Sequence, residues 1–178
     1  MLLLPLRGMA ERHCGLTLAI AEAYVEAARV CLDRHYRPPV EFTIRNGNSA
    51  METVAEWEPT DDRIRSAWLN EISATESGAY ACVIAAVELS EGLYAIRRAE
   101  TRTGADYYLA PSAIEQGDLE GCVRLEVSGS NLGSWAVLAR RLREKVEQTL
   151  RGNSNLPAMA GVVGFRARVI LLSQVLKP

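Results

Sequence analysis

The chain has 178 residues, of which 48% are hydrophobic and 24% charged, and its formal net charge is −2. This balance excludes a disordered, collagen-like or low-complexity chain, which would lack the apolar content of a folded core. The length suits a single domain over 1–178, and the apolar run that opens the chain is far shorter than the roughly 20 residues of a membrane span. We therefore expect one soluble, cytoplasmic domain with no membrane segment.

The N-terminal part predicts a helix followed by a strand. Residues 9–33 lack proline and are rich in alanine, leucine and valine, which favours a helix, and Pro38 and Pro39 cannot continue it. Residues 40–44 alternate apolar and polar side chains, as a short strand does. The Asn46-Gly47-Asn48 sequence that follows is typical of a turn.

Helical sequence resumes in the next segment. Residues 49–60 are ambiguous, but Pro59-Thr60-Asp61-Asp62 is typical of a helix start. Residues 61–71 and 74–90 favour helix, and a break near Gly78 is expected if they form one element.

Beyond residue 92 the periodicity changes to that of strands. Strands are predicted over 94–100, 106–109 and 122–128, with a tight turn at 102–104 and a polar connection over 111–121. Because the connections are short, the three strands are expected to form an antiparallel meander.

A second amphipathic helix follows this meander. Ser130-Asn131 offers an N-cap, Gly152 can end the helix, and apolar residues recur at helical spacing between them, at Trp135, Leu138, Leu142, Val146 and Leu150. Residues 158–173 are apolar and predict one buried strand. The predicted fold class is α+β (α/β), with a helix–three-stranded meander–helix–strand core. Its mixed sheet is flanked by helices, and an N-terminal helix and strand are added.

Charge and cysteine placement limit the chemistry. Residues 1–96 carry 8 arginines and 14 acidic residues, a net charge of −6, whereas 97–178 carry 10 arginines, 2 lysines and 8 acidic residues, a net charge of +4. The C-terminal half is therefore expected to face something anionic. The cysteines form no CxxC pair, and His13 and His35 are the only histidines, so a zinc finger or a His-based triad is not expected.

Three carboxylates interrupt the apolar patterns. Glu76 lies four residues before Tyr80 on an apolar helix face, Asp106 opens the second strand, and Glu126 lies inside the third. Each also has an ordinary explanation. Glu76 can lie at a solvated helix N-terminus, Asp106 can cap a hairpin turn, and Glu126 can lie on a solvent-exposed face of the strand. Together they can hold a divalent cation, Mg²⁺ or Mn²⁺, through hard oxygen ligands, and such a cation activates water and stabilises charge in phosphodiester hydrolysis.

The order of these elements and acids resembles the PD-(D/E)xK nuclease superfamily, over roughly residues 74–173. By this resemblance Asp106 matches the motif aspartate, Glu126 the motif glutamate and Glu76 the acid of the first helix. Residues 1–70 are then an N-terminal elaboration with no counterpart. The resemblance implies a metal-dependent nuclease whose metal ligands are Glu76, Asp106 and Glu126.

One departure concerns the motif lysine, which orients water and stabilises negative charge. Ser128 stands at its position, and serine can bind a water but carries no charge. Lys145, on the following helix, is the expected substitute. Other cations are available at Arg97, Arg98 and Arg124, although arginine cannot act as a base. The predicted catalytic set is thus Asp106, Glu126, Ser128 and Lys145.

The basic helix suggests how a nucleic acid would be held. Its cations form either a solvated face or a phosphate-binding surface, and they are Arg140, Arg141, Arg143, Lys145 and Arg151. Tyr107 and Tyr108 are the best candidates for stacking on bases.

Three hypotheses follow. The first is a metal-dependent nuclease acting on nucleic acid in a defence or mobile-element context. The second is a non-catalytic protein of the same fold, which Ser128 and the net charge of −2 favour. The third is an unrelated α+β immunity or accessory protein that acts through protein contacts at its acidic N-terminal half and helix 9–33. A homodimer is expected only because homodimers are common.

Overall fold

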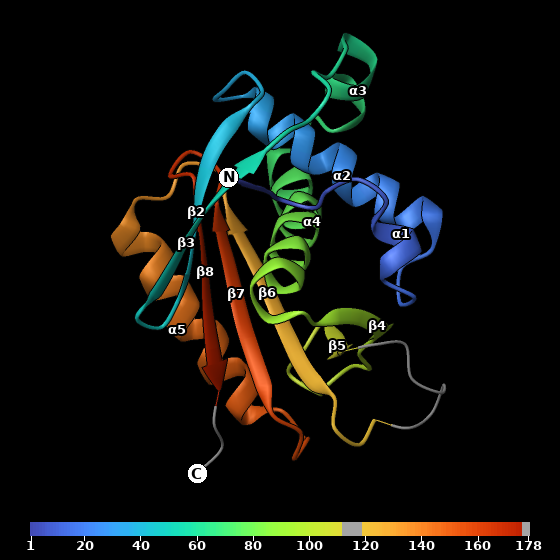
Figure 1. Ribbon diagram of the computed structural model, residues 1–178, viewed down its shortest axis with the longest axis vertical. Coiled ribbons are helices and arrows are strands. Elements are labelled where there is room, and N and C mark those ends of the chain that lie inside the picture. The colour runs from blue at the N-terminus through green and yellow to red at the C-terminus, as the bar shows by residue number, and fades with distance from the viewer. Residues whose placement is uncertain (112–118, 176–178) are drawn as a thin grey trace.

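The computed structural model describes residues 1–111 and 119–175 and shows one mixed sheet with helices on both faces (Figure 1). The eight strands lie in the order β1-β3-β2-β8-β7-β6-β5-β4. Their bounds are Leu2–Leu3 (β1), Val40–Asn46 (β2), Ser49–Ala55 (β3), Tyr94–Arg98 (β4), Tyr107–Ala110 (β5), Val123–Ser130 (β6), Ala158–Gly164 (β7) and Val169–Val175 (β8). The helices are Met9–Arg12 (α1), Leu18–Asp33 (α2), Asp62–Ala67 (α3), Glu71–Glu91 (α4) and Trp135–Arg151 (α5).

The predicted α+β class and the helix–meander–helix–strand order are confirmed. Strands β4, β5 and β6 pair antiparallel, and α5 then returns the chain to β7, which pairs parallel with β6. In this register Tyr107 lies opposite Leu125. Most of the expected connection over 111–121 lies outside the described residues.

The single strand predicted over 158–173 is wrong, because the segment forms the antiparallel hairpin of β7 and β8. Its turn contains no glycine or proline that would have signalled a reversal, and Arg168 takes a left-handed conformation with φ 54°. Strand β8 also pairs parallel with β2. The N-terminal residues therefore extend the same sheet as the core.

The single helix predicted over 9–33 is also divided. After α1 the chain passes against β4, where the Gly15 N–H donates to the Ala95 carbonyl at 3.0 Å. A β-carbon on Gly15 would lie 2.5 Å from the Arg97 nitrogen, so this approach requires glycine. Thr17 then caps α2 by accepting a hydrogen bond from the Ile20 N–H.

Helix α4 is the central helix of the molecule. It packs between α2 and the sheet, as Figure 1 shows, and it is buried on nearly every side. The break expected near Gly78 does not occur, and the interruption falls instead between α3 and α4. Among the helices of the described residues, α4 alone is long and apolar enough to cross a membrane, but 61% of its apolar window is buried in the protein. The structure is therefore compatible with a soluble α+β domain.

Helix α5 covers the opposite face of the sheet, against β6, β7 and β8. Side chains of β6 consequently alternate between two helices: Gly129 faces α4, close to Ala79, whereas Glu126 and Ser128 meet side chains of α5. Because β6 extends to Ser130, the expected N-cap at Ser130-Asn131 is wrong, and Ser134 occupies that position. Gly152 ends the helix as predicted.

Candidate functional site

Asp106 lies at the start of β5, where the sheet fixes its backbone. Its N–H donates to the Leu125 carbonyl at 2.7 Å and its carbonyl accepts from the Ala99 N–H at 2.9 Å. The side chain points to neighbouring elements: Oδ1 accepts from the Tyr80 hydroxyl at 2.8 Å, and Oδ2 accepts from the Val127 N–H at 2.8 Å. The carboxylate is 16% exposed, so it is held at the edge of the interior.

Glu126 is buried in the middle of β6 and meets a cation from α5. The Lys145 Nζ donates to Glu126 Oε1 at 2.6 Å and to Gln148 Oε1 at 3.2 Å. Burial and, after it, the neighbouring carboxylate of Asp106 raise the pKa of Glu126, while Lys145 acts in the opposite direction. The structure thus brings Asp106, Glu126 and Lys145 together.

A layer of tyrosines supports Asp106 from the side of α4. Tyr24 of α2 stacks on Tyr80 with ring centroids 4.8 Å apart, and its hydroxyl lies 2.9 Å from that of Tyr107. Burial and the nearby Asp106 carboxylate raise the pKa of Tyr80 to about 12, so the phenol remains a hydrogen-bond donor at neutral pH. The expected stacking role of Tyr107 and Tyr108 does not fit, because both rings are buried.

Arg98 closes this layer at the solvent side. Its guanidinium lies 4.8 Å from the ring centroids of both Tyr80 and Tyr107, and it is 3.4 Å from Asp106 Oδ1. About half of the side chain stays exposed, so the guanidinium can contact a ligand as well. Arg98 is one of the candidate cations of the sequence, whereas no sequence pattern indicates the tyrosine layer beneath it.

The carboxylates open into a broad, shallow cavity of about 980 Å³. Its wall combines Asp106 and Glu126 with three cations, Arg98, Arg102 and Arg151. Arg124 stabilises the backbone behind this wall. It is fully buried and donates to the carbonyls of Thr103, Thr149 and Leu156. Arg124 is therefore a structural anchor that cannot reach a ligand in the cavity.

Two predicted site residues are placed elsewhere. Glu76 is exposed on α4, and among the described residues no group of three His, Cys, Asp or Glu side chains is arranged to hold a metal. The predicted three-carboxylate ligand set is therefore not assembled. Ser128 binds within the protein, since its Oγ accepts from Arg141 Nη1 at 3.3 Å, and the same nitrogen donates to the Gly129 carbonyl at 3.0 Å.

The basic helix presents its cations in two directions. Arg141 and Lys145 turn toward the sheet, as their bonds to Ser128 and Glu126 show. Arg140 and Arg151 are exposed and lie 3.7 and 3.2 Å from glutamates one turn away, and Arg143 is exposed as well. Arg97, the remaining alternative cation, stacks over Tyr108 and pairs with Glu100.

The two carboxylates of the site, Asp106 and Glu126, offer oxygen atoms of the kind that hard divalent cations bind. A carboxylate offers about four lone-pair positions, and Asp106 uses three of them in the bonds described above. Glu126 already meets the ammonium of Lys145, while burial and the Asp106 carboxylate raise its pKa. Mg²⁺ is commonly bound by only one or two carboxylates, with water and substrate oxygens completing its shell.

Comparisons of the chain with protein-family models, with curated proteins and with solved structures found no match.

Proposed function

We propose that this chain is a cytoplasmic, metal-dependent phosphodiester hydrolase of the PD-(D/E)xK type that acts on nucleic acid. The observation that carries the proposal is the 2.6 Å contact between Lys145 and Glu126, beside Asp106. Ser128 stands at the position of the motif lysine on β6, and Lys145 of α5 places an ammonium group against the Glu126 carboxylate instead. The order of α4, the β4–β5–β6 meander, α5 and β7 supports the proposal, since it matches the expected core.

Asp106 and Glu126 would hold Mg²⁺ or Mn²⁺, with Glu76 outside the ligand set. When bound, such an ion neutralises phosphate charge and makes water a stronger nucleophile at neutral pH. Tyr80 and the Val127 N–H fix the carboxylate of Asp106, so that its orientation does not change when substrate arrives.

The cations of the site have separate tasks in this proposal. Lys145 would orient the attacking water and stabilise negative charge on the phosphate, as the motif lysine does in the superfamily. Arg98 and Arg102 face the cavity and would contact phosphate oxygens, together with the exposed Arg140 and Arg143 of α5.

A calorimetric titration with Mn²⁺ tests the metal site without a known substrate. Wild type should bind Mn²⁺, and the Asp106→Asn, Glu126→Gln double variant should not. Glu76→Gln is the matched control, because it removes an exposed carboxylate outside the group and should leave binding unchanged. Absence of binding by folded wild type, both alone and with a non-cleavable oligonucleotide, would contradict the proposal.

Turnover is the second measurement. Labelled single- and double-stranded DNA and RNA should be cleaved by wild type with Mn²⁺, whereas Lys145→Met should lose roughly 100-fold in rate or more. Ser128→Ala should retain most of the activity, because Ser128 binds Arg141.

A non-catalytic protein of the same fold is the second candidate function. It is favoured by the three donors already bound to Asp106 and by the ion pair that engages Glu126. Metal binding without cleavage of any of these four nucleic acids would favour this candidate.

A further inference from the structure

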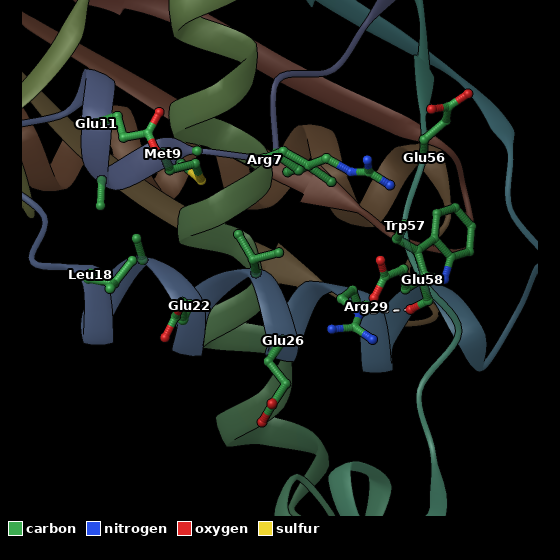
Figure 2. Close-up of a pocket in the computed structure, with 15 residues that line it drawn as sticks. Arg7, Met9, Glu11, Leu18, Glu22, Glu26, Arg29, Glu56, Trp57 and Glu58 are labelled. Atoms are coloured by element: carbon green, nitrogen blue, oxygen red, sulfur yellow. Dashed lines mark hydrogen bonds between the residues drawn. The ribbon is translucent and has the colours of Figure 1, made fainter.

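A second cavity lies on the N-terminal half, away from the carboxylate site. It is a groove of about 600 Å³ between the segment around α1, helix α2 and the chain that follows β3. Figure 2 shows α2 along one wall, the α1 segment along the other, and Trp57 at one end. A volume of about 300–1,000 Å³ is typical of clefts that enclose a ligand or a few side chains.

The floor of the groove is apolar and rigid. Leu6, Met9 and Trp57 are buried in it, and the Trp57 indole is fixed because its Nε1 donates to Asp33 Oδ1 at 2.6 Å. At the open end of the groove, opposite Trp57, Leu18 is the first residue of α2 and is 66% exposed (Figure 2). Val25, further along the same helix, is half-buried. The floor residues are almost closed to solvent, so apolar side chains of a partner would contact chiefly Leu18 and Val25.

The rim of the groove is strongly acidic. The lining includes five glutamates against two arginines: Glu11, Glu22, Glu26, Glu56 and Glu58, with Arg7 and Arg29. Arg29 is already hydrogen-bonded at the Trp57 end of the groove, where its Nε donates to the Glu58 carbonyl at 2.7 Å. Glu26 is also engaged, since it accepts from Trp68 Nε1 at 2.7 Å.

The remaining glutamates form no ion pair among the described residues, and Arg7 is the other cation of the lining. Within residues 1–111 and 119–175, no ion pair joins Glu11, Glu22, Glu56 or Glu58 to a cation. Glu11 comes from α1 and Glu22 from α2, so the two walls at the open end each contribute an exposed carboxylate (Figure 2). An acidic segment or a nucleic acid would be repelled here, whereas a cation would be attracted.

We propose that this groove binds a basic amphipathic segment of a protein partner, in the manner of a helix lying in an apolar groove. Apolar side chains of that segment pack against Leu18 and Val25, and its lysines or arginines meet Glu11 and Glu22. The site is independent of the carboxylate site near α5 and does not depend on the nuclease proposal.

Fluorescence anisotropy with a labelled, helix-forming peptide of leucine and lysine tests this proposal on the full chain. Wild type should bind the peptide, and the Glu11→Gln, Glu22→Gln variant should bind it roughly fivefold more weakly, as expected for the loss of two exposed charge pairs. Leu18→Asp should weaken binding roughly tenfold, because a carboxylate replaces the apolar contact at the open end. All three substituted positions are exposed, so folding should be kept, and circular dichroism verifies this.

Matched controls separate the groove from general attraction of a cation to an acidic surface. The Glu41→Gln, Glu144→Gln variant removes the same charge at exposed positions outside the groove and should bind like wild type. A scrambled peptide of equal composition, which forms no apolar face, should bind at least about tenfold more weakly. Equal binding of the scrambled peptide, equal loss in the control variant, or no binding by wild type would each overturn the proposal.

Discussion

Two charged side chains of β6, Arg124 and Glu126, are removed from solvent by different neighbours. Arg124 has its guanidinium surrounded by backbone carbonyls, whereas Glu126 has a lysine on one side and a carboxylate on the other. A buried charge is costly unless its partners compensate for the lost water. The two residues therefore predict different responses to substitution and to pH.

For Glu126 the prediction concerns the pH dependence of stability. Its pKa in the folded chain is raised above the ordinary value of 4.5, so the unfolded chain releases the proton first as pH rises. Wild type should therefore lose stability relative to Glu126→Gln as pH increases from about 4.5 through the raised pKa, and the difference should be constant above it. Urea denaturation of both proteins over a pH series measures this. A relative gain in wild-type stability over that range would show that the pKa is lowered instead.

For Arg124 the prediction concerns stability alone. Arg124→Met removes the side-chain donor of the Thr103 and Leu156 carbonyls, while the Thr149 carbonyl keeps the Gly152 N–H, and the free energy of unfolding should fall by about 3 kcal/mol. Urea denaturation provides the measurement. Arg140→Met on the exposed face of α5 is the control and should change stability by less than about 0.5 kcal/mol. Similar small effects of both substitutions would refute the anchoring role.

At the scale of elements, the close packing of α2 on α4 depends on one glycine. A β-carbon at Gly78 would lie 2.9 Å from the Ala28 Cα and nitrogen, so a larger residue must push the helices apart. Gly78→Val should destabilise the protein by about 2 kcal/mol, even though it removes a glycine from a helix. Thermal unfolding measures this loss of stability. Ser77→Ala on the same helix is the control and should have little effect on the melting temperature. An unchanged melting temperature in Gly78→Val would mean that the two helices are not in close contact.

The elements that were predicted correctly have local signals, and those that were missed do not. The strand over 122–128 alternates by itself, and a glycine at 152 is a common residue at a helix end. By contrast, the turn between β7 and β8 has no Gly or Pro, and the end of α1 is set by hydrogen bonds to β4, far away in sequence. A helix pattern alone could not show that Gly15 has to pass against that strand.

At the scale of the whole molecule, the N-terminal residues and the core share one sheet. Strand β2 pairs with β8, and α2 covers the outer side of α4. A fragment of residues 71–178 would expose the apolar face of α4 and leave β8 as an open edge. We expect this fragment to show no cooperative unfolding transition and little dispersion of its NMR signals. A cooperative transition would show instead that residues 71–178 are an independent folding unit.

The sequence by itself determined the α+β class, the β4–β5–β6 meander, and the positions of Asp106 directly before β5 and of Glu126 on the adjacent β6. These features follow from alternation and from short connections, which act between near neighbours in the chain. Only the tertiary structure decided that Lys145 meets Glu126, that Tyr24 and Tyr80 support Asp106, and that Glu76 stays outside. Those contacts depend on how α2, α4 and α5 pack against the sheet, and packing of distant segments leaves no periodic trace in the sequence.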